Sequence, residues 1–341
     1  MTKMEIPGPL PVTLGPLPVI PGLTGNLSRD IADYPEGIVL AVDKPYRWTS
    51  ADVIRKLKYA AIKHFSKKNL KVGHAGTLDP LATGVLLVCI GPACKRAQEL
   101  QNHDKEYIAR IRLGATTPSY DLEKEVDRTF PFEHITRADV EAALPAFLGE
   151  QEQVAPLFSA KSVDGVRAYE LARKLYKARL SGTSSVIPGS DRESQFDAAA
   201  LETLHRSRIV ISELELLDFI SAGCDGNRVW GACPPPDEGR GRGPLPEAVG
   251  GVGKADDSEA PVPAGTSASS RIHVADTSAL GLPEAVIRIA CSKGTYIRAF
   301  ARDLGEALGS GAHLGGLIRS RSGAYRVEDA LSVPDALALL S

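Results

Sequence analysis

The chain has 341 residues, of which 43% are hydrophobic and 24% charged, the composition of a water-soluble globular protein with one large or two modest domains. Collagen-like, membrane and wholly disordered classes are excluded, and no apolar stretch is long enough to cross a bilayer. The 40 Lys and Arg nearly balance the 42 Asp and Glu, so binding to a polyanion would depend on local basic patches. Five scattered cysteines without a Cys-x-x-Cys pair indicate an intracellular, reducing environment and argue against a disulfide framework or a zinc site.

The N-terminal segment, residues 1–35, is expected to be a mobile arm. Six prolines between Pro7 and Pro21 stand among small residues, a composition that buries too little surface to offset the entropy of ordering. The pattern changes at Gly37. Gly37 to Asp43 predicts a short apolar strand, Lys44-Pro45 predicts a turn, and apolar residues at helical spacing predict a helix from Ser50.

Further elements are predicted downstream. In Tyr107 to Leu113, apolar residues alternate with Arg110 and Arg112, which is typical of a half-buried strand. The other predicted elements are strands at 208–217 and 285–291 and a helix at 297–308. The irregular alternation of strands and helices favours a mixed α/β or α+β sheet over a doubly wound parallel one.

A low-complexity insertion is expected at about 228–280. Residues 231–270 hold eight Gly and seven Pro in forty positions, with no aromatic residue. This share of Gly and Pro exceeds the usual mark of low complexity. We therefore expect a disordered insertion loop.

The most informative stretch is a Gly-rich loop between Val72 and Leu86. Pro80 fixes the backbone after Asp79, so the carboxylate is presented on a rigid loop, as nucleophilic or general-base chemistry requires. A simple Asp-Pro turn with His74 on the surface is the plain structural alternative. The glycine spacing does not fit a dinucleotide fold, no Gly-Lys-Ser/Thr follows, and no second metal ligand lies at suitable spacing from His74.

This loop resembles the signature of the TruB family of pseudouridine synthases, in the run Gly73-His74-x-Gly76-Thr77-Leu78-Asp79-Pro80-Leu81-Ala82-Thr83-Gly84. Further family motifs follow in order: Leu40 to Pro45 with Thr49-Ser50, Lys105 to Tyr107 with Leu113-Gly114, Phe147 to Gly149, Gln153 to Pro156, Phe158 to Lys161, Gly165 to Glu170, Ser292 to Arg298, Asp303 to Gly305, and Gly311 to Leu314. The resemblance spans about Gly37 to Leu331, and chance matches in this order are implausible.

The resemblance implies a fold and a domain organisation. The fold is the α/β (α+β) pseudouridine synthase fold, a mixed, mainly antiparallel sheet flanked by helices with a thumb-like insertion. The catalytic domain is assigned to residues 36–335, with an extended thumb at about 156–206. The C-terminal RNA-binding PUA domain that most members carry is expected to be absent.

The resemblance also implies the chemistry, isomerisation of a uridine to pseudouridine in the T-loop of tRNA, at position 55. Asp79 would be the catalytic residue, Arg298 would pair with it, and Tyr107 would stack on the base and take part in proton transfer. The residues implied to bind substrate are His74, Tyr296, Leu317, Lys44 and Lys161. Among these, His74 would fill the space that the flipped uridine leaves.

No metal or cofactor is implied. The expected partner is the tRNA T-stem-loop, with no membrane, no required protein partner and a monomeric chain. We expect a cytoplasmic protein, with an organelle or the nucleus as alternatives. Two basic clusters flank the candidate site and would contact phosphates, one of Arg55, Lys56, Lys58, Lys63, Lys67, Lys68 and Lys71, the other of Lys161, Arg167, Arg173, Lys174, Lys177 and Arg179.

The chain departs from the family pattern at three places. Arg47 stands where a glycine is usual, which puts the geometry of the Lys-Pro turn in question. Pro118 and Ser119 replace the usual Asp-Thr pair before Asp121, so we assign Asp121 no role. The connection from Leu180 to His205 is longer than the family's usual one, and target choice could shift there.

Two alternative functions stay open. One is the same reaction on another RNA, because specificity lies in loops that one sequence cannot map onto RNA. The other is a catalytically inactive RNA-binding or tRNA-chaperone relative. The intact set of Asp79, Tyr107 and Arg298 favours an enzyme, because a pure binder has no chemical need for all three. The sequence does not choose between attack on the base and elimination across the sugar.

Overall fold

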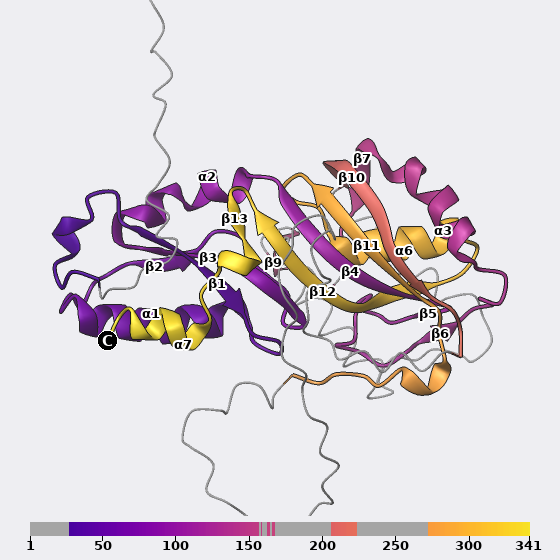
Figure 1. Ribbon diagram of the computed structural model, residues 1–341, viewed down its shortest axis with the longest axis horizontal. Helices are drawn as coiled ribbons and strands as arrows, with labels where there is room; N and C mark the ends of the chain where they lie inside the picture. The colour runs from indigo at the N-terminus through magenta and orange to yellow at the C-terminus, as the bar shows by residue number, and fades with distance from the viewer. Residues whose placement is uncertain (1–26, 157, 159–161, 164–165, 168–205, 224–271) are drawn as a thin grey trace, which may run out of the picture.

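A long mixed β-sheet is the framework of the molecule (Figure 1). The structure is a computed structural model that describes residues 27–156, 158, 162–163, 166–167, 206–223 and 272–341. In the described part, strands follow the order β1-β3-β12-β4-β11-β10-β7, with β2 also beside β3 and β13 beside β12. Neighbours are antiparallel except β3 and β12, which are parallel. This confirms the expected mixed, mainly antiparallel sheet.

The strands of the sheet are β1 (Ile38–Lys44), β2 (Val72–His74), β3 (Ala82–Ile90), β4 (Lys105–Leu113), β7 (Gly149–Val154), β10 (Arg206–Ile220), β11 (Glu284–Cys291), β12 (Ala312–Ser322) and β13 (Tyr325–Arg326). Two small hairpins are β5 (Ala115–Thr116) with β6 (Arg128–Thr129), and β8 (Ser162–Val163) with β9 (Val166–Arg167). The described α-helices are α1 (Ser50–His64), α2 (Ala97–Asn102), α3 (Arg137–Ala143), α6 (Ile297–Ala307) and α7 (Val333–Ala338).

The first helix begins where the sequence predicts it. Thr49 and Asp52 form a reciprocal capping box, in which each side chain accepts a hydrogen bond from the other's backbone N–H. Val53, Leu57 and Ala61 recur at helical spacing and are fully buried. The apolar face of α1 therefore packs on the sheet, beside α7 (Figure 1).

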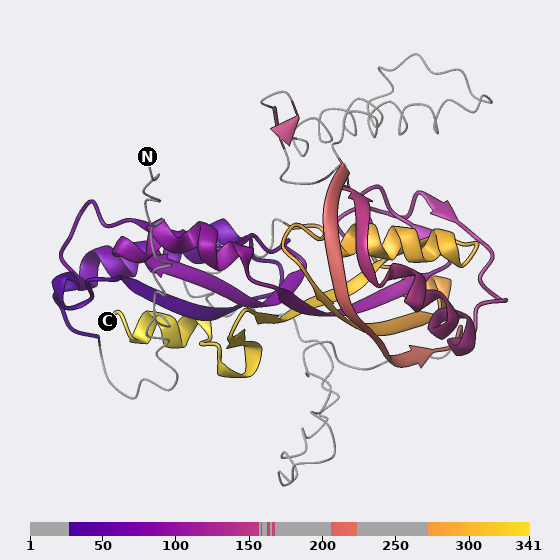
Figure 2. The same ribbon diagram turned by 90° about the horizontal axis from the view of Figure 1, so that it is seen from above.

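The strand that carries Tyr107 also has the predicted alternation. In β4 the apolar residues are buried, whereas Arg110 and Arg112 are half-buried and pair with Glu284 of β11. The predicted strands at 208–217 and 285–291 are confirmed as β10 and β11, with β10 three residues longer at its C-terminal end and two at its start. The predicted C-terminal helix is α6, which covers one face of the sheet against β12 and β4 (Figure 2).

Three expected boundaries need correction. Residues 27–35, assigned to the mobile arm, are folded: Leu27 lies in the core and Tyr34 packs edge-to-face on Phe65. Residues 272–280, assigned to the insertion, also pack, since the Ala275 N–H donates to the Leu122 carbonyl (2.8 Å). The core continues past 335, because Leu340 is buried. Leu27 and Leu340, at the two ends of the described chain, both belong to the main hydrophobic cluster.

Other parts of those expectations lie outside the described residues: 1–26 of the arm, 224–271 of the insertion, and most of the thumb, of which the described part includes the β8–β9 hairpin. The structure also holds a strand that the sequence did not predict, β12, at the centre of the sheet. Within the described residues, no helix combines the length and apolar character needed to span a bilayer.

Candidate active site

The loop between β2 and β3 holds Asp79 in a fixed position. The hydroxyl of Ser50, the first residue of α1, donates to the Leu78 carbonyl (3.1 Å) and accepts from the Leu78 N–H (3.0 Å). Gly76 and Gly84 have positive φ values of 99° and 96°, a region that favours glycine, whereas Gly73 has not. The Asp79 side chain keeps 39% of its surface exposed. The loop is therefore braced by α1 while its carboxylate remains accessible.

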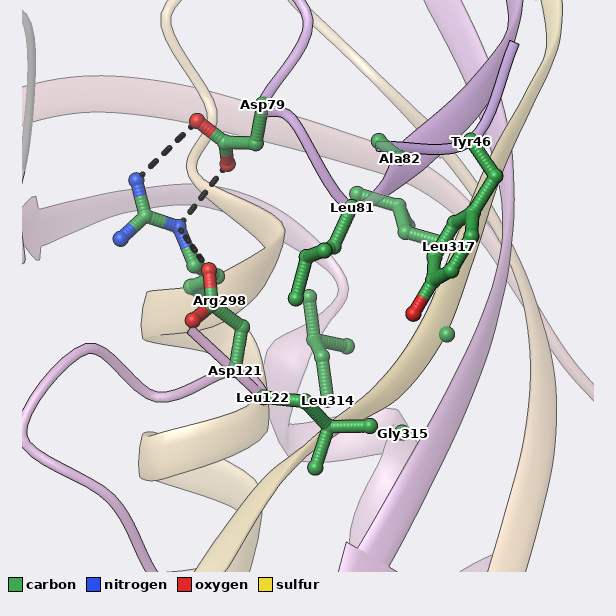
Figure 3. A pocket seen from close by; sticks show the side chains of 11 residues that line it. Tyr46, Asp79, Leu81, Ala82, Asp121, Leu122, Arg298, Leu314, Gly315 and Leu317 are labelled. Atoms are coloured by element: carbon green, nitrogen blue, oxygen red, sulfur yellow. Dashed lines mark hydrogen bonds and ion pairs between the residues drawn. The ribbon is translucent and has the colours of Figure 1, made fainter. Parts of the chain in front are cut away.

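Arg298, in the first turn of α6, hydrogen-bonds to this carboxylate through two nitrogens (Figure 3). Its Nε donates to Asp79 Oδ2 (2.9 Å) and its Nη2 to Asp79 Oδ1 (3.3 Å), although the two residues lie 219 positions apart in sequence. Nη1 and Nη2 also donate to the carbonyls of Ser119 (3.0 Å) and Phe158 (2.9 Å). The structure thus brings together the pair that the family resemblance implied, in the forked geometry that Arg–carboxylate pairs favour.

A second carboxylate, which the sequence left without a role, lies at the same guanidinium. Asp121 Oδ2 is 3.7 Å from Arg298 Nε, and Asp121 Oδ1 accepts from the Ser119 hydroxyl (2.6 Å) and the Glu123 N–H (2.9 Å). Burial raises the pKa of Asp121, and Arg298 opposes that rise. Burial and Asp121 together raise the pKa of Glu123 to about 7. In the sequence, the one sign that Asp121 is buried is its position between Tyr120 and Leu122.

This cluster of charges sets the state of the arginine. Burial lowers the pKa of Arg298, but the charges of Asp79, Asp121 and Glu123 outweigh it and raise the pKa above its usual value. Arg298 is therefore a permanent cation. Its two hydrogen bonds to Asp79 hold that carboxylate in a fixed orientation.

A pocket opens beside the charged cluster, and its walls are largely apolar (Figure 3). Asp79, Asp121 and Arg298 lie at one end, and Leu81, Leu122, Leu314 and Leu317 line the rest with Tyr46. Leu317 was an implied substrate-binding residue, and the structure places it there. Tyr46 was missed, although it directly follows the Lys-Pro turn. The pocket is therefore a largely apolar space that ends in a carboxylate.

Tyr107, Tyr296 and His74 are not among the described residues that line the pocket. Tyr107 is buried in β4. Burial raises its pKa, Arg319 lowers it, and the charge of Asp79 also acts on it. Tyr296 precedes α6, where its N–H donates to Gln153 Oε1 (2.8 Å). His74 ends β2, half-buried, and burial and then Arg319 lower its pKa.

Lys44 does not have the place expected of a substrate-binding residue. It is wholly buried, and its Nζ donates to the carbonyls of Pro45 (2.9 Å), Trp48 (2.6 Å) and Pro80 (3.2 Å). Three backbone acceptors occupy the three hydrogens of an ammonium group. Lys44 is therefore a brace between the turn after β1 and the residue that follows Asp79. The implied role of Lys161 lies outside the described residues.

Arg47, which replaces the family's usual glycine, keeps a glycine-like backbone. Its φ is 61°, in the left-handed region that L-residues rarely adopt. Its N–H donates to the Pro80 carbonyl (3.0 Å), and its Nη2 donates to the Ile272 carbonyl (2.6 Å). The turn geometry thus survives the replacement, and the side chain gains a contact with the segment after the insertion.

The first basic cluster, residues Arg55 to Lys71, is exposed on α1 and on the loop that follows it. Of the second cluster, Arg167 falls in β9 and the other members lie outside the described residues.

Comparison with known proteins gives the family. The model described as "TruB family pseudouridylate synthase (N terminal domain)" matches residues 63–191. A relative named tRNA pseudouridine synthase B from Phocaeicola vulgatus is 44% identical over 301 residues, covering 88% of this chain and 92% of the relative. One of the same name from Thermus thermophilus is 37% identical over 304 residues, covering 86% and 76%.

Among solved structures, a Cbf5-Nop10-Gar1 complex is similar at 19% identity with a TM-score of 0.49, covering 90% of this chain and 56% of that one. An H/ACA RNP bound to a substrate RNA containing 2'-deoxyuridine matches at 19% identity with a TM-score of 0.45, covering 89% and 53%. The named relatives define the class of protein, an enzyme of the pseudouridine synthase class. At 44% identity over most of both chains, the chain belongs to the TruB family of pseudouridine synthases.

Proposed function

We propose that this protein converts uridine to pseudouridine in tRNA, at position 55 in the T-loop, with Asp79 as the catalytic carboxylate. The observation that carries the proposal is the forked Arg298–Asp79 pair at the end of a largely apolar pocket. The relatives' name, tRNA pseudouridine synthase B, supports tRNA as the substrate class.

The reaction is an isomerisation in which atoms balance within one nucleotide. The C1′–N1 bond of uridine breaks, the uracil turns in the pocket, and a C1′–C5 bond forms. The proton on C5 leaves and N1 takes up a proton. An ionised carboxylate at Asp79 serves either route left open by the sequence, by adding to the base or by accepting a proton from the sugar. Arg298 supplies the fixed positive charge that stabilises that carboxylate.

The pocket walls supply the rest of the proposed site. A uracil that detaches must stay in place while it turns, and the leucine side chains hold a flat ring without fixing its rotation about its own axis. The target base must leave the RNA stack before it can enter, which costs a few kcal/mol. The exposed cations of α1 would contribute phosphate contacts toward that cost.

The test uses purified protein with three RNAs: an unmodified tRNA transcript, its isolated T-stem-loop, and the transcript with cytidine at position 55. Pseudouridine is located by mass spectrometry after chemical labelling, with EDTA present to test the expected independence from metals. Product at position 55 in the first two RNAs and none in the third supports the proposal.

Three other outcomes would contradict the proposal. Product at another position of the tRNA, or in other cellular RNA alone, would show the same reaction on a different target. Binding of tRNA with no product in any RNA would favour an RNA-binding relative that has lost catalysis. Loss of activity in EDTA would overturn the expectation of a metal-free site.

A further inference from the structure

A short segment after the insertion, residues 272–277, is tied to a loop that lines the pocket. Ala275 and Thr277 are each 3% exposed, so the 272–277 segment lies against the body of the protein. The Ala275 N–H donates to the Leu122 carbonyl (2.8 Å), and the Thr277 hydroxyl accepts a hydrogen bond from Arg112 Nη1. Two hydrogen bonds, two residues apart, therefore fix this segment in position.

The loop that the 272–277 segment contacts, residues 119–123, is called the pocket loop here because it carries part of the site. Leu122 and Asp121 line the pocket, and the Ser119 carbonyl accepts a hydrogen bond from Arg298 Nη1 (3.0 Å). A displacement of the Leu122 backbone would therefore move a pocket wall and a partner of Arg298 together. Such shifts matter for rate, since a misplacement of about 1 Å can cost roughly 100-fold.

Arg47 holds the other end of the 272–277 segment. Its Nη2 donates to the Ile272 carbonyl (2.6 Å), across 225 positions of sequence, and its backbone N–H donates to the Pro80 carbonyl (3.0 Å). Hydrogen bonds from a charged guanidinium are among the stronger ones in proteins. Tyr46, the residue before Arg47, lines the pocket. The turn after β1 is therefore joined, through one side chain, to the segment that contacts the pocket loop.

A second side-chain contact of the same segment is more exposed to water. His273 Nε2 lies 2.6 Å from Glu125 Oε1, but the two side chains are 61% and 66% exposed. Exposed ion pairs contribute little, because water and salt screen their charges. Arg47 is half-buried, so water competes less for its hydrogen bond to the segment. Arg47 therefore makes the stronger of the two side-chain contacts.

We propose that Arg47 is a positioning residue for pseudouridine formation: by holding the 272–277 segment, it keeps the pocket loop and the turn at Tyr46 at a fixed separation around the target base. This inference rests on the proposed pseudouridine synthase function. Arg47 acts through Ile272 and the pocket loop, and it does not touch the reacting atoms. It stands where the family usually has a glycine, which has no side chain to make this link, so the link is a property of this chain.

The test compares four variants with wild type in single-turnover conversion of tRNA. Arg47→Ala and Arg47→Gly both remove the side chain, but only glycine relieves the positive φ of 61°. Arg47→Lys keeps a cationic donor on the same backbone. Arg137→Ala is the matched control: Arg137 Nη2 also donates to a distant backbone carbonyl, that of Leu216 (3.3 Å), and neither residue is among the described ones that line the pocket beside Asp79. RNA affinity, urea denaturation and hydrogen exchange of the pocket loop are measured on every variant.

We expect Arg47→Ala and Arg47→Gly to lower the single-turnover rate at saturating tRNA equally, by about tenfold, less than a misplacement of about 1 Å can cost. Affinity for tRNA should change by less than about threefold, under 1 kcal/mol. Hydrogen exchange in the pocket loop should be faster in both variants, because local opening becomes easier. Arg47→Lys should restore part of the rate, and Arg137→Ala should stay within about twofold of wild type.

A rate near wild type for Arg47→Gly, whether or not Arg47→Ala is impaired, would confine the role of Arg47 to its own turn and overturn the inference. Loss of rate with unchanged hydrogen exchange in the pocket loop would also contradict it, because the effect would bypass the 272–277 segment. An Arg47→Lys rate no higher than that of Arg47→Ala would refute a link made by a side-chain donor.

Two further outcomes are separable from these. Should Arg47→Ala fail to fold, Arg47→Gly and Arg47→Lys still decide, because glycine relieves the backbone and lysine leaves it as it is. Wild-type protein without product on any RNA would refute the proposed function instead. The hydrogen-exchange comparison needs no turnover, so it would still test the link between Arg47 and the pocket loop.

Discussion

Replacing Gly84 with alanine is a sharp test of how β1, β3 and β12 are held together at the site. Gly84 pairs with Lys44 on one side and with Arg319 on the other, at a φ of 96°. An alanine Cβ would lie 2.3 Å from the Arg319 carbonyl oxygen and 2.8 Å from its carbonyl carbon and its backbone nitrogen, all of them backbone atoms that a rotamer change cannot move.

The expected cost of Gly84→Ala has two parts. An L-residue at positive φ costs roughly 1–2 kcal/mol, and a backbone shift to relieve overpacking adds about 1–3 kcal/mol. We therefore expect the free energy of unfolding to fall by about 2–5 kcal/mol. Gly73→Ala is the control, because Gly73 lies in β2 with an ordinary φ, and a Cβ added to it would meet no atom within 4 Å.

Urea denaturation followed by circular dichroism measures both variants. Gly73→Ala should stay within about 0.5 kcal/mol of wild type. Gly84→Ala should also lose activity under conditions where it remains folded, because displacement of Arg319, whose guanidinium donates to two carbonyls of the loop that carries Asp79, loosens that loop. Equal stability of the two variants would refute the claimed close approach of β3 and β12.

Three further perturbations have defined outcomes. Arg47→Gly should be more stable than Arg47→Ala by about 1 kcal/mol in urea denaturation, because only the glycine relieves the left-handed backbone; the reverse order would contradict strain at this turn. Lys44→Met should destabilise the fold by about 3 kcal/mol or more, because it leaves the Pro80 carbonyl and two others without a donor, whereas Lys58→Met on exposed α1 should stay near wild type. Burial raises the pKa of Glu123 from 4.5 to about 7. The contribution of this carboxyl group to the free energy of unfolding is therefore present in full below about pH 4.5 and is lost as the pH rises through 7. Glu123→Gln should flatten this decline in stability, and an unchanged pH dependence would refute the prediction.

Much of the fold could be predicted from local pattern. The capping box at Thr49 and the spacing of Val53, Leu57 and Ala61 fix the start and the buried face of α1 within one segment of chain. Alternation around Arg110 likewise identifies β4. These features depend on neighbours within a few residues, which a sequence displays directly.

The central strand β12 could not be predicted in this way. Its sequence contains the pair Gly315-Gly316, then Leu317-Ile318 and a polar run from Arg319 to Ser322, which does not alternate as a strand should. Pairing with β3 and β4 on its two sides imposes the extended conformation, and such long-range pairing overrides local preference. The burial of Arg319 within it was hidden for the same reason.

The residues of the site could likewise be predicted only where the sequence carries a local signal or a family motif. Asp79 stands out in the sequence because Pro80 and the surrounding glycines restrict its loop. The resemblance to a known family then identified Arg298 as its partner, and the two form a hydrogen bond. Asp121 was missed because its contact with Arg298 joins residues 177 positions apart and its usual neighbours in the family are replaced. Lys44 was assigned to substrate because nothing local shows that three carbonyls surround its amine.

The most direct test of the catalytic assignment is single-turnover conversion of unmodified tRNA by wild type and by Asp79→Asn, with RNA binding measured on both. The substitution preserves the size of the side chain and removes the charge that Arg298 holds. We predict pseudouridine from wild type and none from Asp79→Asn, with tRNA affinity unchanged within about threefold, less than 1 kcal/mol. Product from Asp79→Asn at a rate comparable to wild type would contradict the role of Asp79.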